Sequence, residues 1–120
     1  MKSALPLILA ATACQTAPVP AQAPPGAEAC SLTVRFGSYA MGIDSSAAAA
    51  VDKALAGNRD VKGVSRSGWG REGEYTLCVT ARDAAASGRL FDTVAALLPR
   101  QPRGPISVEG AGRRVEAPRR

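Results

Sequence analysis

Residues 74–80 read EYTLCVT, and this stretch decides how the rest of the chain is interpreted. Its apolar residues recur at every second position, which is typical of a β-strand with one buried face. A glycine-rich link over 68–73 precedes it, and a weaker strand pattern covers 61–67. Two strands separated by such a link are expected to pair as a hairpin. A similar alternation over 32–36 predicts another half-buried strand.

Two segments show the helical period instead. One begins at Asp44 or Ser45, both good N-cap residues, and ends before Gly57. The other covers 83–98, and its larger apolar side chains fall on a single stripe at helical spacing. Each stripe needs a surface to pack against, so both helices are expected on one face of a sheet.

With a last strand over 105–109, the elements run strand, helix, strand, strand, helix, strand. That order predicts an α+β domain of the ferredoxin-like class, βαββαβ, with an antiparallel four-stranded sheet and two helices on one face. Right-handed crossovers place the strands in the order 4-1-3-2. The domain is expected to span 30–110, followed by a basic C-terminal tail over 111–120.

The N-terminus has the layout of a bacterial export signal. Residues 1–13 read MKSALPLILAATA: a basic start, a short apolar run and small residues that suit cleavage. The apolar run is too short to cross a hydrocarbon core of ~30 Å, so the segment is interpreted as a cleaved signal peptide. Residues 11–13 also satisfy the rule for ordinary signal cleavage, and that alternative stays open.

Cys14 directly follows the small residues, and in this respect the segment resembles the lipobox of bacterial lipoproteins. The resemblance implies that Cys14 is acylated, becomes the mature N-terminus and anchors the protein to a membrane, facing the periplasm. Residues 14–29 are rich in Pro and Ala and are interpreted as a tether. Gln15 stands where enteric lipoproteins carry an Asp for inner-membrane retention, so the outer membrane is preferred.

The chain has three cysteines. If Cys14 carries lipid, Cys30 and Cys78 remain as a pair that can form a disulfide in an oxidising periplasm. The alternation of the strands argues against it, because Cys78 has the parity opposite to Leu77 while Cys30 shares the core parity of Leu32. Either Cys30 precedes the regular strand or a bulge lies between. The alternative is two unrelated buried thiols.

The composition excludes several classes of catalytic site. There is no histidine, so Ser-His-Asp systems, Cys-His systems and histidine metal sites are absent, and no cofactor is expected. Gly68, Gly70 and Gly73 spell the dinucleotide-binding fingerprint, but a strand follows where that motif requires a helix. Whether the protein is an enzyme stays open. The alternative function is a small hydrolase that holds an anionic substrate at the loop 37–43, with Arg35 in its site.

Three predicted loops, 37–43, 68–73 and 99–104, fall at the end of the sheet away from Cys30. Aromatic rings next to guanidinium groups suit sugars, aromatic ligands or anions. The alternative is that the tryptophan folds back onto the hairpin and the arginines are solvated. The candidate binding residues that these loops collect are Tyr39, Arg66, Trp69, Arg71, Arg100 and Arg103.

Residues 34–39 read VRFGSY and are followed by a polar turn and an alanine-rich helix. This opening resembles that of sporulation-related repeat (SPOR) domains. The resemblance implies an exported, ferredoxin-like domain that binds bare glycan strands of peptidoglycan. The second half departs from the family, because residues 78–83 read CVTARD where those domains commonly carry a Val-Gly-Pro-Phe-like turn.

The net charge of +5 is concentrated in the arginines of the C-terminal part. A basic tail suits an anionic lipid surface, whereas nucleic acid is not expected as a partner of an exported protein. The sequence therefore predicts a small exported cell-envelope binding module, with cell-wall glycan or a partner protein as its ligand. It makes no prediction of oligomeric state.

Overall fold

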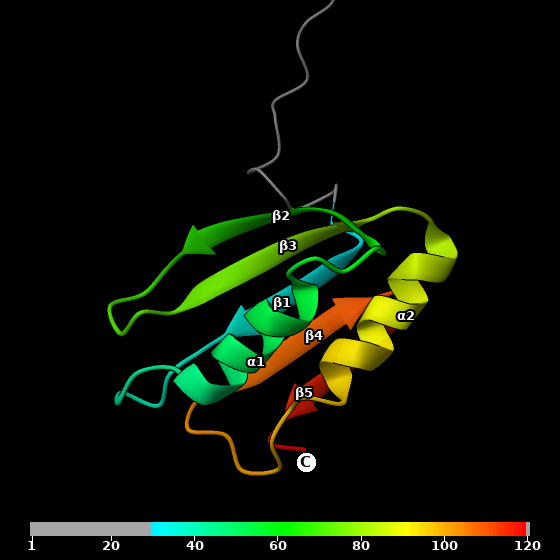
Figure 1. The fold of residues 1–120 in the computed structure, drawn as a ribbon. Coiled ribbons are helices and arrows are strands. Elements are labelled where there is room, and N and C mark those ends of the chain that lie inside the picture. The colour runs from blue at the N-terminus through cyan, green and yellow to red at the C-terminus, as the bar shows by residue number, and fades with distance from the viewer. Residues whose placement is uncertain (1–29, 120) are drawn as a thin grey trace, which may run out of the picture.

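The computed structural model describes residues 30–119, which form an antiparallel sheet with two helices on one of its faces (Figure 1). The predictions for the signal peptide, for Cys14 and for the tether fall outside these residues. Within residues 30–119, neither helix has the length and apolar character needed to cross a membrane. The elements are β1 (Leu32–Phe36), α1 (Ser45–Leu55), β2 (Val61–Gly68), β3 (Tyr75–Ala81), α2 (Ala84–Ala95), β4 (Ile106–Gly110) and β5 (Arg113–Ala117).

The sheet has five strands in the order β2-β3-β1-β4-β5, and every neighbouring pair is antiparallel. The α+β class, the order of the first six elements and the neighbours of the first four strands agree with the prediction. The predicted sheet of four strands is wrong, because Arg113–Ala117 pairs along the whole of β4. This strand lies in the segment that the sequence analysis assigned to a basic tail.

A tight hairpin connects β4 to β5. Ala111 and Gly112 both adopt positive φ, at 51° and 71°. Two successive residues in this region make the kind of turn whose twist matches that of paired strands. The sequence analysis interpreted these small residues as a break at the end of the domain, whereas they turn the chain back onto the sheet.

Both helices begin at an aspartate. Asp44 is the N-cap of α1, where its Oδ1 accepts the Ala47 N–H at 3.0 Å. Asp83 caps α2 in the same way and accepts the Ala86 N–H at 2.7 Å. Each side chain satisfies a backbone donor that has no partner within the helix. Of the two predicted caps for α1, the chain therefore uses Asp44 rather than Ser45.

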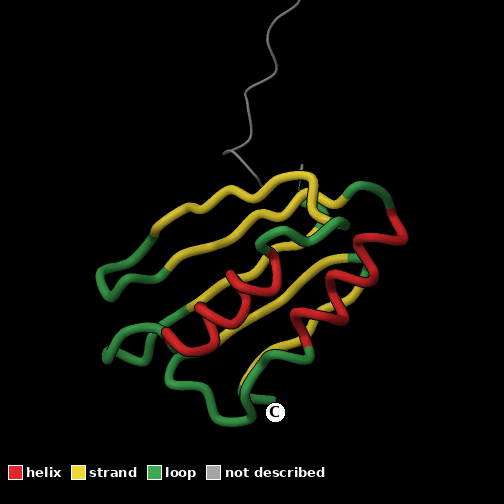
Figure 2. The backbone as a smooth tube through the Cα atoms, in the orientation of Figure 1, coloured by secondary structure: helices red, strands yellow, loops and turns green. Residues whose placement is uncertain are grey.

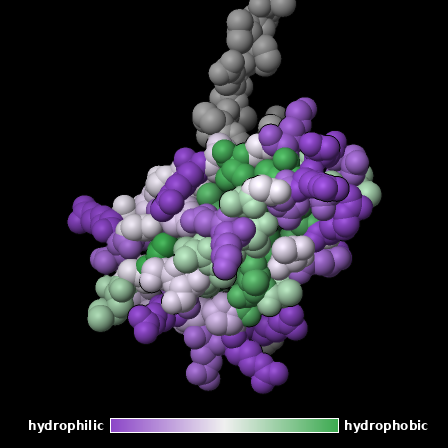
Figure 3. Space-filling view, viewed as in Figure 1, coloured by the Kyte–Doolittle hydropathy of each residue, from purple (hydrophilic) through white to green (hydrophobic). Residues whose placement is uncertain are grey.

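The hydrophobic core fills the space between the helices and one face of the sheet. The rings of Phe36 and Tyr75 pack against each other within it, with centroids 4.9 Å apart. Figure 3 views the molecule from the helix side, where hydrophilic side chains cover much of the surface and apolar groups show between them. The largest fully buried side chains are Phe36, Leu32, Leu90, Ile106, Val34, Val51, Val79, Val94 and Val108.

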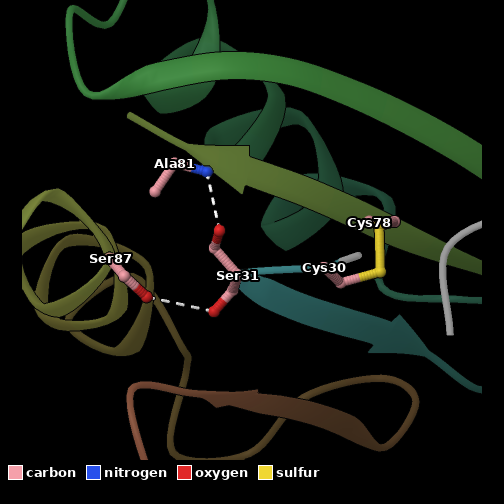
Figure 4. The surroundings of a disulfide bond; sticks show 5 residues. All are labelled: Cys30, Ser31, Cys78, Ala81 and Ser87. Carbon is pink, nitrogen blue, oxygen red and sulfur yellow. Dashed lines mark hydrogen bonds between the residues drawn. A yellow bond between two sulfur atoms is a disulfide. The ribbon is translucent and has the colours of Figure 1, made fainter. Parts of the chain in front are cut away.

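The predicted disulfide between Cys30 and Cys78 is confirmed, with the two Cα atoms 5.1 Å apart (Figure 4). Cys30 precedes β1, so the alternation of that strand does not apply to it. The chain bends at Ser31, whose Oγ accepts the Ala81 N–H at 2.9 Å and whose carbonyl accepts the Ser87 hydroxyl at 3.1 Å. These contacts fix the start of β1 against both β3 and α2.

Candidate functional site

The sheet face opposite the helices carries mostly polar side chains. The register shows why, because residues that pair across strands point to the same face of a sheet. Arg35 of β1 pairs with Thr76 of β3 and with Ser107 of β4. Beyond them, Ser67 of β2 and Glu116 of β5 complete one row across all five strands. None of these residues has a helix over it, so the row is open to a ligand.

Trp69 lies directly after β2 and is held in place on this open face. Its indole N–H donates to Thr76 Oγ1 at 3.0 Å. The Arg35 guanidinium carbon lies 5.2 Å from the centroid of the indole ring. The Trp69 residue still keeps 39% of its surface exposed. The ring is therefore both oriented and accessible, which lowers the entropy lost when a ligand packs on it.

The loop after β1 and the loop before β4 lie at the same end of the sheet (Figure 2). The Gly37 N–H donates to the Pro105 carbonyl at 2.7 Å, which joins the end of β1 to the segment before β4. The approach is close, because a Cβ at Gly104 would meet the Gly37 carbonyl oxygen at 2.1 Å. Ser38 orders the loop further, since its Oγ accepts the N–H groups of Ala40 and Gly42. We call the loop after β1 and the segment before β4, which these contacts hold together, the rim.

Rim and sheet together enclose an open hollow of about 470 Å³, which we call the distal hollow. It lies at the end of the open face away from Cys30. Tyr39, which is 56% exposed, stands on the loop after β1 and contributes a second aromatic ring. The polar and aromatic residues that line the hollow are Arg35, Tyr39, Trp69, Ser107, Arg114 and Glu116. The rest of the lining is Gly37, Pro105, Ile106, Ala117 and Pro118.

Of the predicted binding residues, Tyr39 and Trp69 meet in the distal hollow, where Arg35, predicted only for the hydrolase alternative, also lies. Arg66 does not, because it pairs with Leu77 and therefore points to the helix face. There its guanidinium carbon lies 3.6 Å from the centroid of the Tyr75 ring. The prediction grouped Arg66 with the loops although it falls within the strand predicted over 61–67, and its position in β2 turns it to the helix face.

The other three predicted arginines also lie elsewhere. Arg71 is exposed in the turn of the hairpin. Arg100 lines a separate hollow of about 640 Å³ between the end of α2 and β5. Arg103 contributes its backbone, since its N–H donates to Asp44 Oδ2 at 3.0 Å. Only the two aromatic members of the predicted cluster thus reach the same place.

Asp44 connects the helix layer to the rim of the hollow. The hydrogen bond from the Ala47 N–H, followed by that from the Arg103 N–H, lowers the pKa of its carboxyl group. The Asp44 residue is 7% exposed, and its carboxylate already occupies the N-terminus of α1. The N–H groups of Ala40 and Gly42 likewise have Ser38 as their acceptor. These contacts do not favour an anion cradle in the loop 37–43, so the hydrolase alternative gains no support.

The two charged residues at the β5 side of the hollow neutralise each other. Arg114 donates through Nε and Nη2 to Glu116 Oε1, at 3.0 and 2.6 Å. Glu109 lies 3.7 Å from the same guanidinium group. The contact with Glu116, and then the charge of Glu109, raises the pKa of Arg114. Sequence reasoning missed Arg114 and Glu116 because it treated their segment as a tail.

The side chains of the distal hollow offer aromatic surface and hydrogen-bond donors. Among residues 30–119, no three His, Cys, Asp or Glu side chains are grouped so that they could hold a metal ion. Comparison of the chain with protein-family models, with curated proteins and with solved structures gave no match. The distal hollow is therefore the feature of this domain that indicates a function.

Proposed function

We propose that this protein is a small exported module of the bacterial cell envelope that binds cell-wall glycan in the distal hollow. In this proposal Cys14 carries the lipid anchor, residues 14–29 form the tether, and the domain is a ferredoxin-like fold with an added fifth strand. The outer membrane is the preferred location. The observation that carries the proposal is the ordered, accessible indole of Trp69, beside Arg35 and facing the same hollow as Tyr39.

The chemistry of the hollow suits a saccharide. Sugar rings have apolar faces that pack on aromatic rings, and hydroxyl groups around their edges that need hydrogen-bond partners. Trp69 and Tyr39 supply the first kind of contact. Arg35 and Ser107, which pair across neighbouring strands and line the hollow, supply the second. An open sheet face also leaves room for a polymer to continue across neighbouring strands.

The SPOR-like stretch supplies part of the lining. Residues 34–39 include Arg35, Gly37 and Tyr39, and all three line the distal hollow. The hollow is lined by residues that follow β1 and β2 and precede β4, so it lies at the end of the sheet opposite Cys30. In this proposal the tether joins the domain at Cys30. A lipid anchor at Cys14 would therefore leave the hollow facing away from the membrane, toward the cell wall.

Binding to purified peptidoglycan sacculi, measured by cosedimentation, tests the proposal. We expect the wild-type protein to bind and Trp69→Ala to bind about tenfold more weakly, because the variant loses an aromatic contact surface. Tyr39→Ala should weaken binding as well. Met41→Ala is the matched control, since Met41 is 92% exposed in the same loop and does not line the hollow.

Two results would contradict the proposal in different ways. Sacculus binding that both aromatic variants leave unchanged would place the glycan site elsewhere. A wild-type protein that does not bind sacculi would make an envelope protein the ligand instead. The anchor is tested separately by the intact mass of protein from its native membrane. A chain that begins at Cys14 with added acyl mass is the expected result.

A further inference from the structure

Arg35 is the basic side chain nearest the centre of the open face. It projects from β1, the middle strand, and lies between Thr76 on one side and Ser107 on the other. Both neighbours carry hydroxyl groups, and the Thr76 hydroxyl can still donate its proton after accepting the Trp69 N–H. Arg35 and Ser107 line the distal hollow, and Thr76 borders Arg35 on the neighbouring strand and holds the Trp69 ring beside it.

The charge at this point is not compensated. Among residues 30–119, no carboxylate forms a salt bridge with Arg35, whose contact in this region is the Trp69 ring. The other arginine in the hollow, Arg114, is paired with Glu116. The lining of the distal hollow therefore carries a net charge of one positive unit, and that unit is located at Arg35.

A guanidinium group presents its N–H donors in a planar fork that matches a carboxylate. We propose that the ligand of the distal hollow is an acidic saccharide whose carboxylate pairs with Arg35 while the attached sugar ring packs on Trp69. This inference rests on the proposed function and specifies the chemistry of its ligand. One uncompensated positive charge matches a singly charged carboxylate better than a doubly charged phosphate monoester. The short distance from Arg35 to the indole requires the carboxylate to lie close to the ring.

The test compares two probes that differ only at this carboxylate: a disaccharide of N-acetylglucosamine and N-acetylmuramic acid, and its uncharged lactyl methylamide. Trp69 is the only tryptophan in the chain, so its fluorescence reports binding at the hollow. We expect the wild-type protein to prefer the acid about fivefold, near the upper range for an exposed ion pair. The preference should shrink as salt is added, because the charges are exposed.

Arg35→Gln should bring the preference close to one, and Arg35→Lys should restore part of it. Arg71→Gln is the matched control, because it removes the same charge from a residue outside the hollow. Circular dichroism would show that each variant is folded. A preference that survives Arg35→Gln, or a wild-type protein that binds both probes equally, would overturn the inference and leave glycan binding intact. A wild-type protein that binds neither of the two probes and does not bind sacculi would overturn the proposed function itself.

Discussion

The two faces of the sheet are built from the same strands and have opposite characters. In β1, Leu32, Val34 and Phe36 are completely buried beneath the helices, while Thr33 and Arg35 lie between them on the open face. Burial restricts the first set to apolar side chains that fill the available volume. No such restriction applies to the second set, so the open face is where the chain can carry binding groups without loss of its core.

The sharpest test of this contrast uses neighbouring residues of one strand. Phe36→Ala should lower the free energy of unfolding by roughly 3–5 kcal/mol, because it leaves a cavity beside Tyr75 in the core. Arg35→Ala should change it by less than about 0.5 kcal/mol, as is usual for exposed positions. Urea denaturation followed by circular dichroism measures both. Comparable losses for the two variants would mean that the open face also holds the fold together.

The disulfide is an exception to the rule that stabilising contacts lie on the sheet face under the helices. Cys78 pairs with Thr33 and therefore belongs to the open face. It joins residues that are 48 positions apart, and such a cross-link restricts the unfolded chain. Replacing both cysteines with serine should lower the free energy of unfolding by about 2–4 kcal/mol. Reduction of the wild-type protein should have a similar effect. A decrease in the free energy of unfolding below about 1 kcal/mol would contradict this, and would assign the stability to the sheet face that packs against the helices, which we call the covered face.

A loss smaller than that of the Phe36 or cysteine variants is expected at Asp44, through which the helix layer reaches the rim of the hollow. Asp44→Ala should cost about 1 kcal/mol, the usual value of an N-cap. Asp44→Asn keeps the acceptor for Ala47 but loses the second oxygen that accepts from Arg103, so its loss should be smaller.

The pH dependence of stability provides an independent check on Asp44. Because folding lowers the pKa of this carboxyl below 3.8, its contribution is complete above that pH. The contribution is lost as the pH falls through the lower folded-state value. Thermal melts in this acidic range should therefore depend less on pH in Asp44→Ala than in the wild-type protein. An unchanged dependence would mean that other carboxylates control it.

Much of the covered face could be predicted from the sequence. In β1 and β3 the alternation of apolar and polar residues indicates which side is buried, and in the two helices the apolar stripe does so. Burial selects apolar side chains at each of these positions. The aspartate caps were predictable for a similar local reason. The fifth strand could not be predicted in this way. Residues 113–117 read RRVEA, and the charged side chains among them leave no clear alternation of apolar and polar residues. Val115 and Ala117 become recognisable as inward-facing only once β4 is there to pair with them.

The open face was predicted less well. Tyr39 and Trp69 were found because aromatic residues in loops are conspicuous by themselves. Arg66 was assigned to the same group because it is close to the hairpin in sequence, yet its parity in β2 turns it to the other face. Arg35 was assigned only to the hydrolase alternative, and its neighbours Thr76 and Ser107 were not recognised at all.

The sequence by itself determined the two helices, the strands that alternate, and which of their residues enter the core, because these properties depend on near neighbours along the chain. Only the tertiary structure decided that Arg35, Thr76 and Ser107 share one row, that Trp69 lies over it, and that β5 extends it. Those juxtapositions depend on the register between strands that are distant in sequence. Register is set by the packing of the whole core, which no single segment contains.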